Sequence, residues 1–384
     1  MANLRVNLPG LDMKNPVIPA SGTFGFGYEF TKFYDINILG SMMLKGTTLE
    51  PRFGNPLPRI AEGPSGMLNA IGLQNPGVDA VINEELEKLR PLYNDKVIAN
   101  IGGSAIDDYV ETAKRLSAHD KVGALELNIS CPNVHCGGIQ FGTNPEMAAE
   151  VTRAVKAVSS KPVYVKLSPN VTDIVAMALA VEEAGADGLV MINSFGPCMA
   201  IDVNTGYPIM GSKAGYGWLS GAPIRPLAIR CIYEASQVVN IPIIGVGGIT
   251  CGKDVAEMLM AGASAVQVCT EAILKGPSIY GKIAKELNEF LDENGYADVN
   301  EIKGLTHKKM AARGFRTHSV APVVDDNKCI KCKQCVTSCV YEALEVTDKL
   351  NIDADKCFGC GLCVTRCPKG ALSICYNQVE AMNE

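Results

Sequence analysis

The 384-residue sequence contains no apolar run of about 18 residues, the length that a membrane-spanning helix requires. Its first residues, MANLRVNLPG, lack the apolar core of a secretory signal. Basic residues are not clustered and the formal net charge is -6, so nothing indicates binding to nucleic acid or to an anionic membrane surface. No strand-linked G-x-G-x-x-G is followed by an acidic residue, which leaves no evident site for NAD(P)H or FAD. The first three absences give no sign of a membrane-spanning, secreted or nucleic-acid-binding protein.

Cysteine is sparse in most of the chain and dense near one end. Eight of the 15 cysteines lie between Cys329 and Cys367, six are scattered through the first 270 residues, and Cys375 lies near the end. A secreted disulfide protein is small and rich in cysteine throughout. The distribution therefore indicates a cytoplasmic protein, here with a metal-binding tail.

Short apolar runs alternate with longer amphipathic segments along the first 300 residues. Near-continuous apolar strands separated by helices favour a closed parallel barrel, and an open doubly wound sheet is the alternative. We therefore predict a (β/α)₈ TIM barrel over 1–302, a basic linker over 303–322 and a second domain over 323–384. Helices are expected at 144–159, 171–184, 223–238 and 253–261. The eight predicted strands are 15–21, 38–45, 96–101, 124–130, 162–168, 188–193, 241–246 and 265–269.

The tail contains two copies of the spacing C-x2-C-x2-C-x3-C, at 329–339 and 357–368. This is the spacing of bacterial ferredoxins with two [4Fe–4S] clusters, in which the fourth cysteine of each run binds the other cluster. Paired zinc sites are the alternative, but zinc usually takes two separated C-x2-C pairs. Val340 replaces the proline that follows the last ligand in the second copy, and this position binds no metal. One predicted ligand set is Cys329, Cys332, Cys335 and Cys367, and the other is Cys357, Cys360, Cys363 and Cys339.

Seven segments, in order along the chain, make the barrel resemble class 1 dihydroorotate dehydrogenases, especially the flavin subunit of class 1B enzymes. The similarity covers nearly all of 1–295 and implies an enzyme that binds FMN. The segments are NPVIPASGTFGFG (15–27), KGTTLEPRFGNPLPR (45–59), MLNAIGLQNPG (67–77), ELNISCPNV (126–134), VKLSPNVTDI (165–174), LSGAPIRPLAIR (219–230) and IPIIGVGGI (241–249).

Cys131 and Lys45 are the predicted catalytic residues. A flavin accepts hydride from a carbon held over its ring, and the adjacent C–H must lose a proton to a positioned base. Cys131 follows the fourth predicted strand, and the family places its catalytic cysteine in this NISCPN motif. A buried, inert cysteine is the alternative. Lys45 matches a family lysine close to flavin and substrate.

Asparagine side chains suit a pyrimidine-like substrate, because each amide offers one acceptor and two donors to a ring of alternating C=O and N–H groups. Single loop asparagines are usually turn residues, but the family uses asparagines at these matched positions. In the family the loop that contains Asn69 holds the substrate carboxylate. The predicted substrate-binding residues are Asn69, Ile71, Gly72, Leu73, Asn128, Asn133, Asn193 and Ser194.

The FMN site is expected at the ends of the strands. Glycines allow close approach of backbone N–H groups to a phosphate, and barrels usually bind phosphate after the seventh and eighth strands. Lys166, a buried cation that needs a partner, would offset the negative charge of reduced flavin, and a structural salt-bridged lysine is the alternative. The predicted contacts are Ala20, Ser21, Lys45, Asn100, Asn128, Lys166, Ser220, Gly221, Gly247, Gly248, Cys269 and Thr270.

Two activities follow from the resemblance. The first is interconversion of dihydroorotate and orotate, with electrons passing between FMN and the clusters. The alternative is a dihydropyrimidine dehydrogenase acting on uracil or thymine, because those enzymes fuse a similar barrel to a ferredoxin tail. The segment after Asn193 departs from both patterns, so another cyclic substrate also stays open. In each case a partner, either an FAD/NAD(P)H subunit or a ferredoxin, must exchange electrons with the chain, and we expect a homo- or hetero-oligomer.

Overall fold

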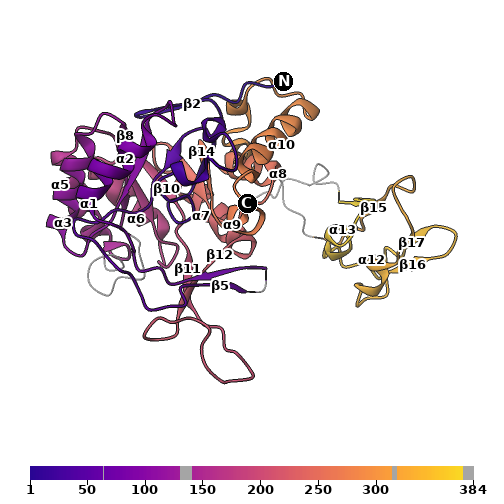
Figure 1. The fold of residues 1–384 in the computed structure, drawn as a ribbon. Helices are drawn as coiled ribbons and strands as arrows, with labels where there is room; N and C mark the ends of the chain where they lie inside the picture. The colour runs from indigo at the N-terminus through magenta and orange to yellow at the C-terminus, as the bar shows by residue number, and fades with distance from the viewer. Residues whose placement is uncertain (64, 130–140, 314–317, 375–384) are drawn as a thin grey trace. The chain divides into compact units, whose positions relative to one another are not determined.

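The computed structural model describes residues 1–63, 65–129, 141–313 and 318–374. The chain divides into two compact units, Met1–His307 and Lys308–Glu384. The first unit contains an eight-stranded parallel sheet (Figure 1). Its order is β3 (Val17–Pro19), β14 (Ala265–Val268), β13 (Ile243–Val246), β10 (Gly188–Met191), β9 (Val163–Leu167), β8 (Val122–Asn128), β7 (Val97–Ile101) and β4 (Met42–Met43).

The sheet curves into a nearly closed barrel, which confirms the predicted fold class. Between the two end strands, the Gly40 amide donates to the Val17 carbonyl at 3.0 Å. Seven of the eight strands fall within the predicted apolar runs, and β8 begins at Val122, two residues before the run predicted at 124–130. All seven residues of β8 are buried, because one face lines the barrel interior and the other is covered by helices.

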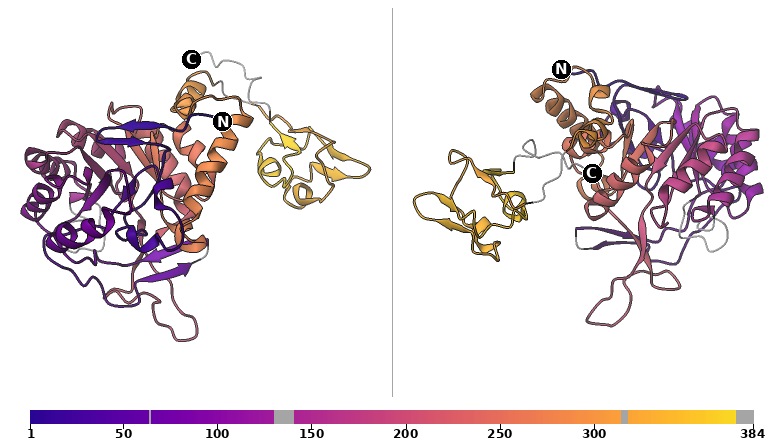
Figure 2. Two further views of the ribbon diagram at one scale, coloured as in Figure 1. Left: turned by 45° about the horizontal axis from the view of Figure 1, so that its top comes forward. Right: turned by 180° about the vertical axis from the view of Figure 1, so that it is seen from behind.

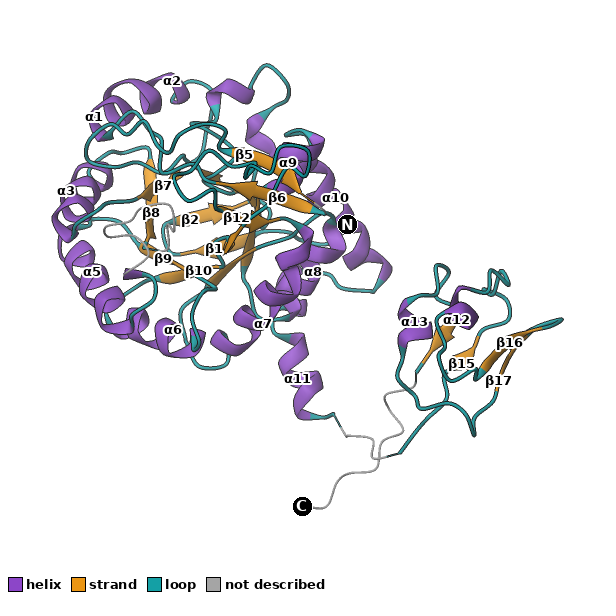
Figure 3. Ribbon diagram, turned by 90° about the horizontal axis from the view of Figure 1, so that it is seen from below, coloured by secondary structure: helices purple, strands orange, loops and turns teal. Residues whose placement is uncertain are grey.

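Helices form a ring around these strands (Figure 3). In α5, for example, the Asn144 side chain accepts from the Met147 amide and Pro145 occupies the first turn, two features that favour a helix start. Among the described residues, no helix is long and apolar enough to cross a membrane. The main ring helices are α3 (Ile106–Ser117), α5 (Pro145–Val158), α6 (Ile174–Glu183), α7 (Arg225–Ala235), α8 (Gly252–Met260) and α10 (Ile279–Glu293).

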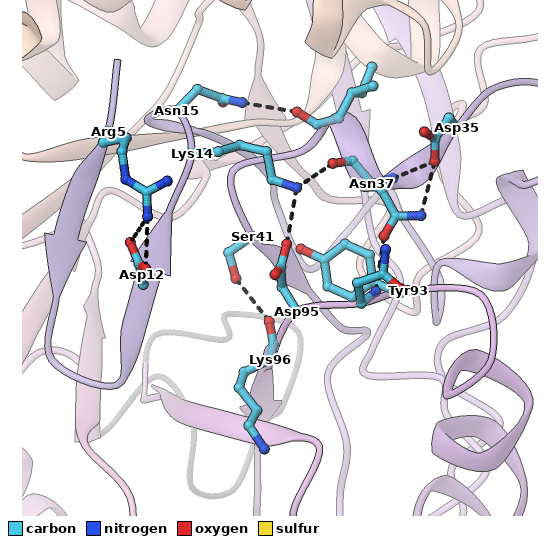
Figure 4. A network of polar contacts seen from close by, with 12 residues as sticks. Arg5, Asp12, Lys14, Asn15, Asp35, Asn37, Ser41, Tyr93, Asp95 and Lys96 are labelled. Atoms are coloured by element: carbon cyan, nitrogen blue, oxygen red, sulfur yellow. Dashed lines mark hydrogen bonds and ion pairs between the residues drawn. The ribbon is translucent and has the colours of Figure 1, made fainter. Parts of the chain in front are cut away.

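A hairpin of β1 (Val6–Leu8) and β2 (Leu11–Met13) covers the N-terminal ends of the barrel strands. Its turn residue Gly10 has φ 76°, and a Cβ there would lie 2.3 Å from the Gly123 carbonyl oxygen. Beside the hairpin, Lys14 pairs with Asp95 at 3.1 Å and donates to the Asn37 carbonyl at 2.5 Å (Figure 4). This end of the barrel is therefore closed by backbone and ion-pair contacts.

A second, antiparallel sheet lies at the opposite end of the first unit (Figures 1 and 2). The segment between its strands β11 and β12 projects away from the barrel (Figure 2). In this sheet Asn69 pairs with Trp218, which carries Asn69 to the C-terminal ends of the barrel strands. Its strands are β11 (Phe195–Cys198), β12 (Gly217–Ser220), β6 (Gly66–Asn69) and β5 (Ile60–Gly63).

Residues 318–374 of the second unit form two pairs of short antiparallel strands and two four-residue helices, α12 (Gln334–Thr337) and α13 (Leu362–Thr365). The division between the units falls after His307 rather than after residue 302, because His307 stacks on Tyr233 and lies 2.9 Å from the Ser236 hydroxyl. Helix α11 (Leu305–Ala311) occupies part of the segment expected to be a linker. The strand pairs are β15 (Val323–Val324) with β18 (Leu372–Ser373), and β16 (Leu344–Val346) with β17 (Leu350–Ile352).

Candidate active site and cluster sites

A cavity of about 440 Å³ lies at the C-terminal ends of the barrel strands, within the size range of small-molecule sites. It brings together residues that are far apart in the sequence, because parallel strands end at the same edge. Of the predicted site residues, those that line it are Ala20, Ser21, Lys45, Asn69, Ile71, Gly72, Leu73, Asn100, Asn128, Lys166, Asn193, Ser194, Ser220, Gly221, Gly247, Gly248, Cys269 and Thr270.

Two predicted residues, Cys131 and Asn133, lie outside the described residues. The nearest described site residue is Asn128, the last residue of β8, which lines the cavity. The hydroxyl of the buried Tyr109 donates to its carbonyl at 3.0 Å, and this fixes the end of the strand. The structure therefore positions the start of the NISCPN segment at the cavity.

A fully buried carboxylate, Glu126, lies beside the cavity and organises its floor. Asn100 donates to Glu126 Oε1 at 2.5 Å, and Gln267 donates to Oε2 at 2.6 Å. Lys166 Nζ lies 3.3 Å from the same Oε1 and 3.4 Å from the amide oxygen of Gln267. Since an ionised carboxylate only accepts, it fixes which atom of each amide points toward it. Lys166 thus has the partner that a buried cation requires.

The amide oxygen of Asn100 is buried and has no hydrogen-bond partner among the described residues. A Cβ on Gly46 would lie 2.7 Å from this oxygen, so only glycine leaves the space beside it open. An unpaired buried acceptor that lines a cavity suits a ligand N–H. Flavin rings carry such a group, and the cation of Lys166 beside it suits an anionic reduced ring. The floor of the cavity therefore fits a flavin.

Glycines form the wall of the cavity near the seventh and eighth strands. Gly248 has φ 73°, and a Cβ there would lie 2.8 Å from the Gly221 carbonyl oxygen. Arg225 does not supply a free cation here, because it pairs with Asp254 at 2.8 Å and with Glu257 at 3.2 Å. A phosphate at this wall would consequently depend on backbone N–H groups.

Lys45 and Arg59 also line the cavity. Burial lowers the pKa of Lys45 below its ordinary value, the positive charge of Arg59 lowers it further, and Glu29 opposes both. Arg59 is held by the backbone carbonyls of Asn55 and Phe53, at 2.5 and 2.6 Å. Two neighbouring cations in a partly buried site favour an anionic ligand.

The segment after β6 shapes the part of the cavity expected to hold a substrate. The Asn69 amide donates to the Trp218 carbonyl at 3.1 Å, which fixes the orientation of the side chain. Gly72 and Leu73 both have positive φ, 73° and 56°. A Cβ on Gly72 would lie 2.6 Å from the Asn55 amide nitrogen, so the loop needs glycine there.

Three residues of this site were missed from the sequence. Glu126 lies inside the apolar run ALELN and Gln267 inside AVQV. A polar residue within an otherwise apolar strand could have indicated that each belongs to the site. Arg59 follows a proline-rich segment with no pattern that places it at the cavity. Its approach to Lys45 depends on the path of the loop between β4 and β5.

The eight cysteines of the tail surround two small cavities. The lining of each combines three cysteines from one motif with the fourth cysteine of the other motif. The first cavity is lined by Cys329, Cys332, Cys335 and Cys367, and the second by Cys339, Cys357, Cys360 and Cys363.

Backbone N–H groups point at several of these sulfurs. The Ala371 amide donates to Cys367 Sγ at 3.2 Å, and the Gly359 amide donates to Cys357 Sγ at 3.4 Å. Burial raises the pKa of Cys367, but amides including that of Ala371 outweigh it and lower the pKa below its ordinary value. Four thiols around a cavity, with N–H donors to sulfur, fit an iron–sulfur cluster.

Comparison with known proteins agrees with both units. The profile of the dihydroorotate dehydrogenase family matches residues 3–291, and that of the 4Fe-4S dicluster domain matches residues 322–374. The catalytic subunit of dihydroorotate dehydrogenase B (NAD(+)) from Anoxybacillus flavithermus is 60% identical over 304 residues, which are 79% of this chain and 96% of the relative. The same subunit from Geobacillus kaustophilus is 58% identical over 308 residues, 80% of this chain and 97% of the relative.

The matched residues make up nearly the whole of these relatives, which leaves no room in them for a segment as long as 322–374. The cluster unit is therefore an addition to the part that the relatives share. The family match, in contrast, covers the barrel strands and most of the residues around its cavity. The chain belongs to the dihydroorotate dehydrogenase family and carries a 4Fe-4S dicluster domain after its barrel.

Proposed function

We propose that the chain oxidises dihydroorotate to orotate with FMN as its flavin, and passes the electrons through two [4Fe–4S] clusters to a partner. The observation that carries this proposal is the cavity. It contains asparagine side chains, two neighbouring cations that favour an anionic ligand, and a floor that fits a flavin. When bound, FMN supplies the hydride acceptor. The relatives named dihydroorotate dehydrogenase B support the choice of substrate.

The chain's own residues bind and orient the ligands in this proposal. Asn100 accepts from the flavin ring, Lys166 faces it as a cation, and Gly247 and Gly248 allow backbone N–H groups to approach the phosphate. Cys131 removes the proton from the substrate carbon, as the resemblance implies. The remaining proposed flavin contacts are Ala20, Ser21, Lys45, Asn128, Ser220, Gly221, Cys269 and Thr270.

A carboxylated ring suits the cavity better than a plain dihydropyrimidine. Lys45 and Arg59 give this side of the cavity positive charge, and the backbone carbonyls of Asn55 and Phe53 hold Arg59 in place. The Asn69 side chain is oriented by Trp218, and the loop after it offers the backbone of Ile71 to Leu73. Asn128, Asn133, Asn193 and Ser194 would hydrogen-bond the ring itself.

The grouping of the tail cysteines around two cavities supports two clusters with crossed fourth ligands. The names of the relatives include NAD(+) and call them catalytic subunits, which supports a role for this chain beside an electron-transferring partner. That partner would be an FAD/NAD(P)H subunit or a ferredoxin, so the working protein would be an oligomer. A cytoplasmic location belongs to the same proposal.

Anaerobic flavin bleaching tests the substrate directly. Dihydroorotate, dihydrouracil and dihydrothymine are mixed separately with the purified protein, and the rate of flavin absorbance loss is measured. We expect dihydroorotate to be the fastest by a wide margin. Faster bleaching by dihydrouracil or dihydrothymine would instead assign the protein to dihydropyrimidine oxidoreduction.

Iron and sulfide analysis tests the clusters. The protein should contain about eight iron and eight sulfide per chain, since each cluster has four of each. Cys335→Ala removes one ligand of the first cavity, so about half of the iron should be lost while flavin content stays constant. Cys231→Ala, which changes a buried cysteine in the barrel, is the control. Zinc without labile sulfide would refute the clusters.

A further inference from the structure

The two cluster cavities have the same cysteine spacing but different neighbours. Aligning CIKCKQC (329–335) with CFGCGLC (357–363) places Lys331 opposite Gly359 and Lys333 opposite Gly361. Lys333 precedes α12 and Gly361 precedes α13, and both residues are left-handed. Each lysine therefore occupies the position at which the second copy has a glycine.

The two lysines adopt a backbone conformation that disfavours a side chain. Their φ values are 55° and 62°, close to the 68° and 79° of the matched glycines. For a residue with a Cβ this region is unfavourable by roughly 1 kcal/mol or more, whereas glycine enters it freely. Lysine at both positions therefore needs a reason other than stability, and strained backbone of this kind is characteristic of functional sites.

The lysines give the first cavity a positive rim. Among the described residues, its lining includes Lys331, Lys333 and Lys369 and no acidic residue. All three are exposed, and none is in an ion pair among residues 318–374 of the tail. The nearby Lys328, in contrast, pairs with Asp325 at 3.2 Å. We call the surface formed by Lys331, Lys333 and Lys369 the basic rim.

Within the described part of the tail, no charged residue lines the second cavity, where the exposed rings of Tyr341 and Phe358 stack at 4.4 Å. The two cluster sites thus differ in charge although they repeat one motif. A shared structural requirement of the fold does not explain the basic rim, because the second site is built without it.

We propose that the basic rim docks an acidic one-electron carrier protein, which exchanges electrons with the cluster held by Cys329, Cys332, Cys335 and Cys367. The proposal rests on the proposed function, from which the electrons come. Oxidation of one dihydroorotate releases two electrons and two protons, and two carrier molecules are each reduced by one electron. No bond forms between the carrier and this chain.

Charge complementarity identifies the partner as acidic. Exposed lysines that form no ion pair attract an oppositely charged surface and raise its association rate, and salt weakens this attraction. Because the lysines surround a cavity that fits a cluster, the acidic protein that binds them is expected to be a redox protein. Uncharged small acceptors would gain nothing from the rim.

A purified acidic bacterial ferredoxin is the probe for the test. Its affinity for the anaerobic holoprotein is measured by titration calorimetry for wild type and for K331G/K333G. We expect binding to weaken about three- to tenfold at low ionic strength, as for the loss of two exposed charges. The difference should shrink toward 1 M salt, where the Debye length is about 3 Å. Because glycine is the favoured residue at both positions, the variant should melt no lower than wild type.

A charge-moving variant supplies the matched control. K333G/G361K keeps the net charge but moves a lysine from the first cluster site to the second, where a Cβ would meet only Ile374 Cδ1, at 3.5 Å. The proposal predicts that it binds the ferredoxin as weakly as K333G does. Recovery of wild-type affinity would mean that only net charge matters, and this would overturn the proposal.

Two further readouts separate the possible failures. If K331G/K333G binds the ferredoxin with wild-type affinity, the docking site is overturned. It is also overturned if the variant transfers electrons more slowly to the ferredoxin and to an uncharged quinone by the same factor, because such a result indicates a change in cluster potential alone. Flavin bleaching by dihydroorotate does not require the carrier and should be unchanged in the variant. If wild type is not bleached but still binds the ferredoxin through the rim, the proposed substrate fails and the docking site stands.

Discussion

Glu126 Oε1 lies 3.3 Å from Lys166 Nζ beneath the cavity, and both side chains are almost completely excluded from solvent. The same carboxylate accepts from Asn100 and Gln267. Because it fixes the amide of Asn100, the oxygen of that amide is left for a ligand. Glu126 therefore determines both the net charge of the cavity floor and which atom of the Asn100 amide faces the cavity, without itself lining the cavity.

Glu126→Gln should raise the midpoint potential of the flavin and destabilise the protein. Removing the carboxylate leaves Lys166 uncompensated, which favours the more negative reduced flavin, and breaking one partner of a buried pair costs about 3–5 kcal/mol. Spectroelectrochemistry and thermal melting measure the two effects. K166M should shift the potential in the opposite direction, and E126Q/K166M should lie between them. An unchanged potential in E126Q would remove Glu126 from flavin tuning.

Arg59→Met should raise the pKa of Lys45. Burial, the larger cause of the lowered pKa, remains, but the neighbouring positive charge is lost. A lowered lysine pKa leaves more neutral amine at a given pH, so the variant should be acylated more slowly and its labelling curve should move to higher pH. Mass spectrometry of the flavin-free protein, labelled with an amine-reactive ester between pH 7 and 10, measures this shift. R59K keeps the charge and should resemble wild type.

The same lowered pKa predicts how Lys45 contributes to stability. The unfolded chain binds the Lys45 proton more strongly than the folded chain does. The contribution of Lys45 to the free energy of unfolding therefore becomes more favourable as pH rises from the pKa of Lys45 in the folded chain toward its ordinary pKa. R59M brings the two pKa values closer together, so it should reduce this pH dependence.

Asn69→Ala should affect dihydroorotate far more than dihydrouracil. A site built to hydrogen-bond a group discriminates against an analogue without it by up to about 10⁴-fold, because buried donors are left unpaired. Comparing flavin-bleaching rates for both compounds in wild type and variant measures the discrimination. If the variant loses the same fraction of its bleaching rate with both compounds, Asn69 contacts the ring or supports the fold and does not bind the carboxylate.

Cys131→Ala should retain flavin but slow flavin reduction by about 10²–10⁴-fold, the usual contribution of a positioned base. Cys131→Ser should keep part of the rate, with its optimum at higher pH, because a hydroxyl loses its proton less readily than a thiol. Stopped-flow bleaching across pH checks both variants, with C198S as a control outside the proposed set. A wild-type rate in C131A would mean that another group is the base.

Much of the fold was predictable from local sequence. Parallel strands covered on both faces must be nearly continuously apolar, so runs such as 96–101 and 162–168 mark β7 and β9 directly. Polar residues at strand ends, such as Asn100 and Asn193, could be expected at one edge because all parallel strands end there. In the structure Cys367 lines the same small cavity as the three closely spaced cysteines of the first motif, and the assignment of these cysteines as metal ligands stays a prediction.

Contacts between segments distant in sequence could not be predicted in this way. Nothing local distinguishes Lys166 bound to Glu126 from a lysine with no partner, because their pairing depends on β8 and β9 lying in register. The positive φ of Lys331 and Lys333 likewise appears only in three dimensions. The sequence by itself determined the order of the strands along the chain, the position of the cavity at their ends and the spacing of the cysteines in the tail. Tertiary structure alone decided which charges are paired and which line a cavity or lie exposed. Pairing depends on distances of a few ångströms between residues that the sequence separates by tens to hundreds of positions.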